Sequence, residues 1–420
     1  MKKVLTFILA VLIGAGCLTA CSEEKGGEEA QTQTDTETST PVTDESTSGE
    51  QSGDEGGDEE EDDGEKVEEQ FTPDTFKITD TTPGVKVLGV RNLSSDSYLR
   101  MDWSCSGAEF AIDLNGGDIK FNIEPTDPCY FRFWIDGKEY SQNGSVYFTA
   151  KRMQPIVLTD VPAGKHTVKM MKVTGYTLAR AKLKSIAFAG SMLTDVVDTS
   201  DKELYIEFVG DSITCAYGTI GTINGNKYTD QDGTLAYSYL LAEALDADYS
   251  MTALSGHKLI GQMDSMYLYT SHLASKQQQY DFARKADIVV INIGTNDEIK
   301  GESESDFKEA YISFLKAVKE KNGEKCKILC LYNAMVDTFS DAILEAVAEV
   351  GGADRGISTY KLARAAGDPG KHPSAEEHVA YAEALLPIIK DLPESKVGDF
   401  TVVDAGDGNF DVLAWSDLEE

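Results

Sequence analysis

The stretch LYIEFVGDSITCAYG at residues 204–218 decides how the second half of this 420-residue chain folds. Its first six residues, 204–209, are largely apolar and predict a strand, and Gly210-Asp211-Ser212 follows directly. Glycine permits a tight turn after the strand, which would expose the Ser212 hydroxyl at the strand end. A hydroxyl there becomes a nucleophile if a base lies within hydrogen-bond reach. Asp and Ser are also common helix caps, so the tripeptide alone allows a purely structural interpretation.

Strands and helices alternate beyond Ser212. Predicted strands cover residues 249–254, 286–293 and 328–332, and predicted helices cover 236–244, 306–321, 341–350 and 374–389. The run at 286–293 is rich in Ile and Val throughout, as in a strand covered on both faces. The alternation predicts an α/β domain at residues 199–392 with a mainly parallel sheet. The tail at residues 393–420 contains apolar stretches and is expected to be packed.

Residues 76–195 have a different sequence pattern. Short segments rich in β-branched and aromatic residues cover 85–90, 97–104, 109–114, 119–123 and 130–135. Turn signals such as Asn115-Gly116-Gly117 separate them. Many short strands with frequent turns predict a β-sandwich domain.

The first 21 residues predict an export signal. Lys2 and Lys3 precede an apolar run at residues 4–15, which is shorter than the ~20 residues needed to cross a bilayer. The following Leu-Thr-Ala-Cys tetrad resembles a bacterial lipobox and implies that Cys21 carries lipid. We therefore expect an exported protein that is lipid-anchored at the bacterial cell surface or membrane. The alternative is a plain secreted protein.

An acidic segment at residues 22–70 follows the signal. Residues 22–69 contain 20 Asp and Glu against Lys25 and Lys66, and they supply −18 of the net charge of −34. The segment has too few apolar residues to form a core. It is therefore expected to be an extended tether. An acidic tail for a basic partner is the alternative. An acidic chain without a basic cluster also argues against nucleic-acid binding.

The seven cysteines show neither a zinc motif nor a disulfide framework. Cys17 lies inside the signal and Cys21 is the proposed anchor, which leaves an odd number for the folded domains. Cys105 and Cys129 could pair in an exported β domain, but their spacing does not show whether they do.

Polar groups follow two further predicted strands. Asn296 lies in Gly-Thr-Asn-Asp directly after the strand at 286–293, and Gly256 follows the strand at 249–254. Reactive groups of an α/β sheet gather where strands end. The Asn296 amide and the Gly256 N–H could both donate to an oxyanion. Ordinary turn residues are the alternative at both positions.

A base is available in the loop that enters the last helix. His372 lies in the sequence GDPGKHPS at residues 367–374, and it is one of five histidines. A loop histidine near a nucleophile can act as a general base, and a carboxylate can orient it. Taken alone, His372 could equally be a surface residue.

Together and in this order, the four blocks resemble the SGNH (GDSL-type) hydrolases. The resemblance implies Ser212 as nucleophile and His372 as base. It also implies an oxyanion hole made by the N–H groups of Ser212 and Gly256 and by the Asn296 amide. The oxyanion glycine is followed by His257, where a second glycine often stands in the related esterases.

The residue that would orient the base departs from this pattern. The usual spacing is Asp-x-x-His, but Pro369 stands three residues before His372 and Asp368 stands one further away. Either Asp368 orients the imidazole, or a backbone carbonyl does so and leaves a Ser–His dyad.

A β-sandwich that contains Asp136-Gly137 and the segment 163–168, followed by residues 210–218, resembles the second family of carbohydrate esterases over residues 80–390. The resemblance implies a jelly-roll domain before a three-layer α/β/α SGNH domain. It also implies a serine esterase that removes O-acetyl groups from polysaccharides such as xylan or glucomannan through an acetyl-enzyme. No metal or organic cofactor is expected.

Two alternatives remain for the function. A non-catalytic, glycan-binding surface lipoprotein would use the β domain and leave the hydrolase domain inert. An esterase acting on acetylated bacterial glycans would keep the chemistry and change the substrate.

Overall fold

The computed structural model describes residues 74–89, 91, 94–95, 97–221, 227–270, 279–337, 339–366, 371–392, 402–404 and 410–412. The predicted signal, the acidic tether, Cys21 and Asp368 lie outside the described residues, as does most of the tail. Among the helices that the structure describes, none is long and apolar enough to cross a membrane.

Two antiparallel sheets form the N-terminal domain. One has the order β10-β6-β12-β4-β3 with β1 beside β12, and the other has the order β13-β5-β11-β7-β8 with β2 on β5 and β9 on β7. Their strands are β1 (Asp74–Lys77), β2 (Lys86–Leu88), β3 (Ser94–Ser95), β4 (Tyr98–Met101), β5 (Ser106–Leu114), β6 (Gly117–Pro125), β7 (Cys129–Ile135), β8 (Lys138–Glu139), β9 (Phe148–Ala150), β10 (Ile156–Val161), β11 (Gly164–Lys172), β12 (Ala181–Phe188) and β13 (Gly190–Leu193).

The two sheets pack face to face through alternating apolar side chains. On β6, Ile119, Phe121 and Ile123 are buried while most residues between them are partly or fully exposed. The Phe121 ring contacts Phe110 and Phe133 of the opposite sheet, with ring centroids 6.4 and 4.7 Å apart. The predicted β-rich first half is therefore confirmed as two layers around one core.

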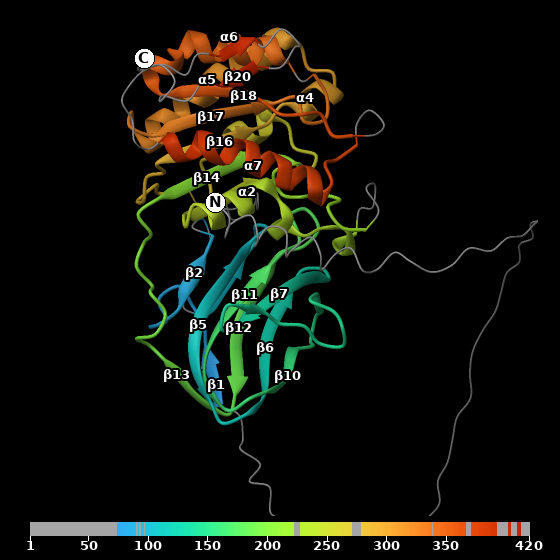
Figure 1. Ribbon diagram of the computed structural model, residues 1–420, viewed down its shortest axis with the longest axis vertical. Coiled ribbons are helices and arrows are strands. Elements are labelled where there is room, and N and C mark those ends of the chain that lie inside the picture. Colours follow the sequence, from blue (N-terminus) through green and yellow to red (C-terminus); the bar gives the residue numbers. More distant parts are fainter. Residues whose placement is uncertain are drawn as a thin grey trace, which may run out of the picture. The chain divides into compact units, whose positions relative to one another are not determined.

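The C-terminal domain is built on a parallel sheet of order β15-β14-β16-β17-β18 (Figure 1). All four strand pairs in it are parallel. Its strands are β14 (Tyr205–Gly210), β15 (Asp248–Ala253), β16 (Ile288–Asn292), β17 (Lys327–Tyr332) and β18 (Ile357–Lys361). Its helices are α2 (Tyr237–Ala244), α3 (Asp264–Met266), α4 (Thr295–Ile299), α5 (Glu304–Asn322), α6 (Ser340–Val350) and α7 (Ala375–Asp391). A short hairpin of β19 (Val402–Asp404) and β20 (Phe410–Val412) follows.

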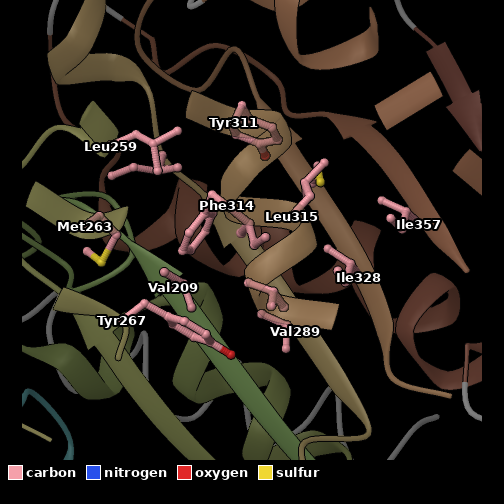
Figure 2. Close-up of a cluster of buried hydrophobic side chains, with 14 of the residues drawn as sticks. Val209, Leu259, Met263, Tyr267, Val289, Tyr311, Phe314, Leu315, Ile328 and Ile357 are labelled. Atoms are coloured by element: carbon pink, nitrogen blue, oxygen red, sulfur yellow. The ribbon is translucent and has the colours of Figure 1, made fainter. Parts of the chain in front are cut away.

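Each face of this sheet has its own helical cover. Figure 2 shows Val209, Val289 and Ile328 from three strands against Phe314 and its neighbours on α5. The opposite face packs on α2 and α7. Strand β16 is buried at every residue because it contributes to both cores, which is why it is apolar up to its last residue, Asn292.

A buried charge interrupts the strand that precedes the nucleophile. Glu207 in β14 is 0% exposed, although residues 204–209 were expected to form a largely apolar strand. The guanidinium of Arg91, from the N-terminal domain, donates from Nε and Nη2 to Glu207 Oε1 at 3.2 and 2.9 Å. The hydroxyls of Tyr205 and Tyr267 donate to the same carboxylate at 3.0 and 2.6 Å. A residue of the N-terminal domain therefore neutralises the buried charge in strand β14 of the C-terminal domain.

Cys105 and Cys129 are both free, buried thiols, so the disulfide considered from the sequence does not form. Cys105 packs with the core under α2 and α7, whereas Cys129 packs inside the β-sandwich. The two side chains therefore belong to different cores. Burial raises the pKa of Cys129 to about 11, so its thiol stays protonated at neutral pH.

Replacing Arg91 with Met should lower the free energy of unfolding by about 3–5 kcal/mol, because it leaves the Glu207 carboxylate buried without its cation. Urea unfolding followed by far-ultraviolet circular dichroism would measure the change. Lys308→Met is the matched control, since Lys308 pairs with Glu345 at the surface. Equal effects of the two substitutions would contradict the role given to Arg91.

Candidate active site

Ser212 lies two residues beyond the last residue of β14, in a turn that closes on itself. The N–H of Tyr217 donates to the Ser212 carbonyl at 2.9 Å, and Ser212 is 4% exposed. Gly210 is required both by this turn and by the neighbouring strand. A Cβ at this position would lie 2.1 Å from the hydroxyl oxygen of Thr214 in the turn and 2.7 Å from the carbonyl oxygen of Asn292 on β16. Glycine therefore lets the turn close and lets β14 and β16 end side by side.

Three of the four predicted blocks meet at this edge of the sheet. Gly210 is in register with Ala253 of β15 and with Asn292 of β16, so the turns after all three strands are adjacent. The turn after β15 contains Gly256 at φ +79°, and the turn after β16 contains Gly294 at φ +127°. Both conformations favour glycine, which explains its place in each block.

The amide of Asn296 connects these turns. Its Nδ2 donates to the backbone carbonyl of His257 at 3.0 Å and to Asp211 Oδ2 at 3.4 Å. Asp211 is fully buried and also accepts from the N–H of Ile213 at 3.0 Å. The structure thus brings the predicted oxyanion amide against the turn that carries the nucleophile. Sequence analysis did not identify Asp211 as a residue that orients this amide.

A second buried acid, Asp297, holds the loop that contains Gly256. Its carboxylate accepts from the N–H groups of Leu259 and Ile260 at 2.8 and 3.0 Å. Lys300 completes the attachment by donating to the Gly256 carbonyl at 2.5 Å. Helix α4 and the residue that follows it therefore position the two predicted oxyanion donors that lie outside the Ser212 turn. These donors are the Asn296 amide and the Gly256 N–H. Sequence reasoning singled out Asn296 here and missed Asp297.

His372 lies against the same turn as Ser212. Its ring packs on Tyr217 with centroids 4.7 Å apart. The loop ends at Ser374, which forms a capping box with Glu377 at the N-terminus of α7. His372 Nδ1 has no hydrogen-bond partner within the described part of the chain. Since Asp368 falls outside that part, its role in orienting His372 stays a prediction.

Burial sets the charge state of the two titratable groups nearest the nucleophile. It lowers the pKa of His372 to about 4, so the imidazole is neutral and can accept a proton at pH 7. It raises the pKa of Asp211 to about 7, with the Asp297 carboxylate adding to the rise and the Ile213 N–H opposing it. In the part of the chain that the structure describes, no group of three His, Cys, Asp or Glu side chains is placed to hold a metal ion.

This arrangement agrees with the comparison with known families. Residues 208–408 match the model of the GDSL-like Lipase/Acylhydrolase family. The match covers most of the α/β domain. The Gly-Asp-Ser turn, the Asn296 block and the His372 loop all lie within the matched residues.

Two curated proteins are similar over both domains. The chain is 25% identical over 343 residues to the cellulase/esterase CelE of Acetivibrio thermocellus, which covers 77% of this chain and 40% of that protein. It is 26% identical over 287 residues to an acetylxylan esterase / glucomannan deacetylase of Cellvibrio japonicus, which covers 60% of this chain and 73% of that protein. The chain thus spans two fifths of the length of the first relative.

Solved structures share the fold of both domains. A family two carbohydrate esterase from Cellvibrio japonicus superposes with a TM-score of 0.66 at 19% identity, covering 77% of this chain and 99% of that one. A family two carbohydrate esterase from Clostridium thermocellum in complex with cellohexaose superposes with a TM-score of 0.61 at 25% identity, covering 73% and 98%.

The pKa values of His372 and Asp211 predict two steps in the pH dependence of kcat/KM for p-nitrophenyl acetate. Activity should fall tenfold per pH unit below about 4, where His372 gains a proton and can no longer act as a base. A shallower decrease is expected as the pH falls through about 7, because a protonated Asp211 binds the Asn296 amide less strongly. Asp211→Asn should remove the shallow step and keep the deep one. A deep step near 6.5 in both proteins would contradict the pKa of His372.

Proposed function

We propose that this protein is a serine esterase that removes O-acetyl groups from a polysaccharide of the xylan or glucomannan type. One observation carries the proposal: Ser212, the Asn296 amide and the Gly256 loop converge at one edge of the sheet, and His372 packs on the turn of the nucleophile. The names of the two curated relatives, an esterase linked to a cellulase and an acetylxylan and glucomannan deacetylase, support the substrate class. We also propose that the β-sandwich, which consists of two antiparallel sheets, belongs to the jelly-roll class.

The reaction begins with attack of Ser212 Oγ on the acetyl carbonyl carbon. His372 accepts the hydroxyl proton, and negative charge develops on the carbonyl oxygen. The N–H groups of Ser212 and Gly256 and the Asn296 amide donate to that oxygen. One such donor is worth about 10²–10³ in rate, because it is aimed at the charge before the reaction starts.

Collapse of the tetrahedral intermediate completes the transfer. The bond to the sugar oxygen breaks, and His372 returns its proton to that oxygen, so a free sugar hydroxyl and an acetyl-enzyme remain. Water then attacks the acetyl-enzyme while His372 again accepts a proton. Acetate leaves and Ser212 is regenerated. Either Asp368 or a backbone carbonyl orients His372 through Nδ1 during both halves.

The buried acids explain how the donors keep their geometry without substrate. Asp211 holds the Asn296 amide and Asp297 holds the backbone that follows Gly256. Both carboxyls are desolvated, and burial raises the pKa of each. Such groups cost stability and are typical of sites whose polar groups are fixed in advance.

Acetate release from acetylated xylan and glucomannan by the purified protein tests the proposed activity. The parent protein should release acetate, and Ser212→Ala should lower kcat by about 10⁴-fold or more, because it removes the nucleophile. Ser255→Ala is the control, since this serine lies in the neighbouring turn without a proposed chemical role. If neither the parent nor Ser212→Ala releases acetate while both bind the polysaccharide, the protein is a glycan-binding module.

We also propose that Cys21 anchors the exported protein to the bacterial membrane through lipid. The support is the Leu-Thr-Ala-Cys tetrad after a short apolar run. Cells expressing the full chain and fed radiolabelled palmitate should incorporate label into the protein, and Cys21→Ala should abolish the incorporation. Cys17→Ala is the matched control and should keep the label. Label that persists in Cys21→Ala would contradict the anchor.

A further inference from the structure

A buried carboxylate on the segment 227–232 is not used by the proposed chemistry. Asp230 is 5% exposed, and its Oδ2 has no hydrogen-bond partner in the part of the chain that the structure describes. Within the described residues, its Oδ1 has a long contact of 3.5 Å with the Thr229 hydroxyl. A desolvated carboxylate oxygen without a donor is costly, so Oδ2 is available to accept a hydrogen bond from a bound molecule.

The backbone around Asp230 is fixed, so the missing partner is not explained by a loose segment. The Ile220 N–H donates to the Asp230 carbonyl at 3.2 Å. Asp232, two residues on, is fully paired by the Arg132 guanidinium and the Tyr147 hydroxyl, both at 2.9 Å. A Cβ at Gly221 would lie 2.5 Å from Asp230 Oδ1, so that glycine lets the backbone close one side of the carboxylate.

Three tyrosine rings form a row near the segment that carries this carboxylate, in which Tyr147 and Tyr228 each contact Tyr130. Tyr130 and Tyr147 of the β-sandwich stack with centroids 5.0 Å apart and an interplanar angle of 26°. Tyr228, two residues before Asp230, meets Tyr130 edge-on at 5.1 Å. All three side chains are half-buried. We call Asp230 with these three tyrosines the tyrosine–aspartate cluster.

The cluster lies next to the proposed reaction centre. Burial raises the pKa of Tyr130 and of Tyr217, and the charge of Asp230 adds to the rise at both. Asp230 is thus near Tyr217 as well as Tyr130. Tyr217 belongs to the Ser212 turn, and its ring packs on His372. A ligand that extends from the nucleophile towards the β-sandwich would meet Asp230 and the tyrosines.

The chemistry of the cluster fits one class of ligand. A pyranose presents hydroxyl donors at its rim and an apolar C–H face, which match a carboxylate acceptor and aromatic side chains. The carboxylate would repel a uronic acid at the same place. We propose that the tyrosine–aspartate cluster is a subsite for a neutral sugar unit of the substrate chain, with a sugar hydroxyl donating to Asp230 Oδ2. The inference rests on the proposed function and adds the part of the substrate that the β-sandwich recognises.

Kinetics on a large and a small substrate test the subsite. Asp230→Ala should raise KM for acetylated xylan about tenfold or more, because it removes a hydrogen bond to a charged acceptor. The kcat/KM for p-nitrophenyl acetate, which does not reach the subsite, should stay within about twofold of the parent's value. Asp246→Ala is the control, because the side chain of Asp246 is 90% exposed and pairs with Lys202. An unchanged KM for acetylated xylan, or an equal loss on both substrates, would overturn the subsite.

Binding without turnover separates this inference from the proposed activity. Calorimetry with xylohexaose and cellohexaose on Ser212→Ala should detect binding of at least one of them, and adding Asp230→Ala should weaken it about tenfold or more. A parent protein without esterase activity but with Asp230-dependent binding would refute the proposed function and keep the subsite. Equal binding by the single and double variants would refute the subsite while leaving the esterase activity untouched.

Discussion

The position of the nucleophile depends on a buried ion pair between the two domains. Glu207 lies in the same strand as Gly210, and it is completely removed from solvent. An unpaired carboxylate at this depth would destabilise strand β14. Arg91 supplies the compensating charge, and two tyrosine hydroxyls donate further hydrogen bonds. Because Arg91 comes from the N-terminal domain, the buried charge in the strand before the Ser212 turn is compensated across the boundary between the two domains.

The same dependence on buried polar groups continues at the carboxyl edge of the sheet. Asp211 and Asp297 hold the two donors that follow β16 and β15, and each carboxylate is itself held by backbone N–H groups. Desolvation raises the pKa of both acids, so their placement opposes stability. The benefit to catalysis is that hydrogen-bond donors already oriented toward the oxyanion need no reorganisation as negative charge develops on the substrate.

The β-sandwich contacts the active site through the segment 227–232 as well as through Arg91. Arg132 and Tyr147 bind Asp232, which ties this segment to strand β7 and to the loop before β9. The charge of Asp230, two residues before Asp232, helps to raise the pKa of Tyr217, whose ring packs on His372. The geometry explains how one domain could supply the chemistry while the other contributes to the recognition of a long substrate.

The sequence by itself determined the architecture and most of the candidate site. Hydrophobic alternation in residues 76–195 and the strand–helix alternation beyond Ser212 specify a β-rich half before an α/β half, since each period is imposed by local backbone geometry. The blocks around Ser212, Gly256 and Asn296 could be found because parallel strands end at one edge of their sheet. His372 could be found because it precedes a strong helix start.

Only the tertiary structure decided which side chains meet across these elements. Glu207 was hidden in an apolar strand, because its partner Arg91 is 116 residues away in the chain. From the sequence, Asp211 and Asp297 could be interpreted as turn and cap residues. Their contacts with Asn296 and with the loop after Gly256 became evident only in the structure. Cys105 and Cys129 were a possible pair until each was found in a different core. Asp230 could not be distinguished from other surface acids, because burial and the lack of a partner are properties of packing. Local periodicity determines the elements, whereas burial, pairing and pKa depend on contacts between residues far apart in the chain.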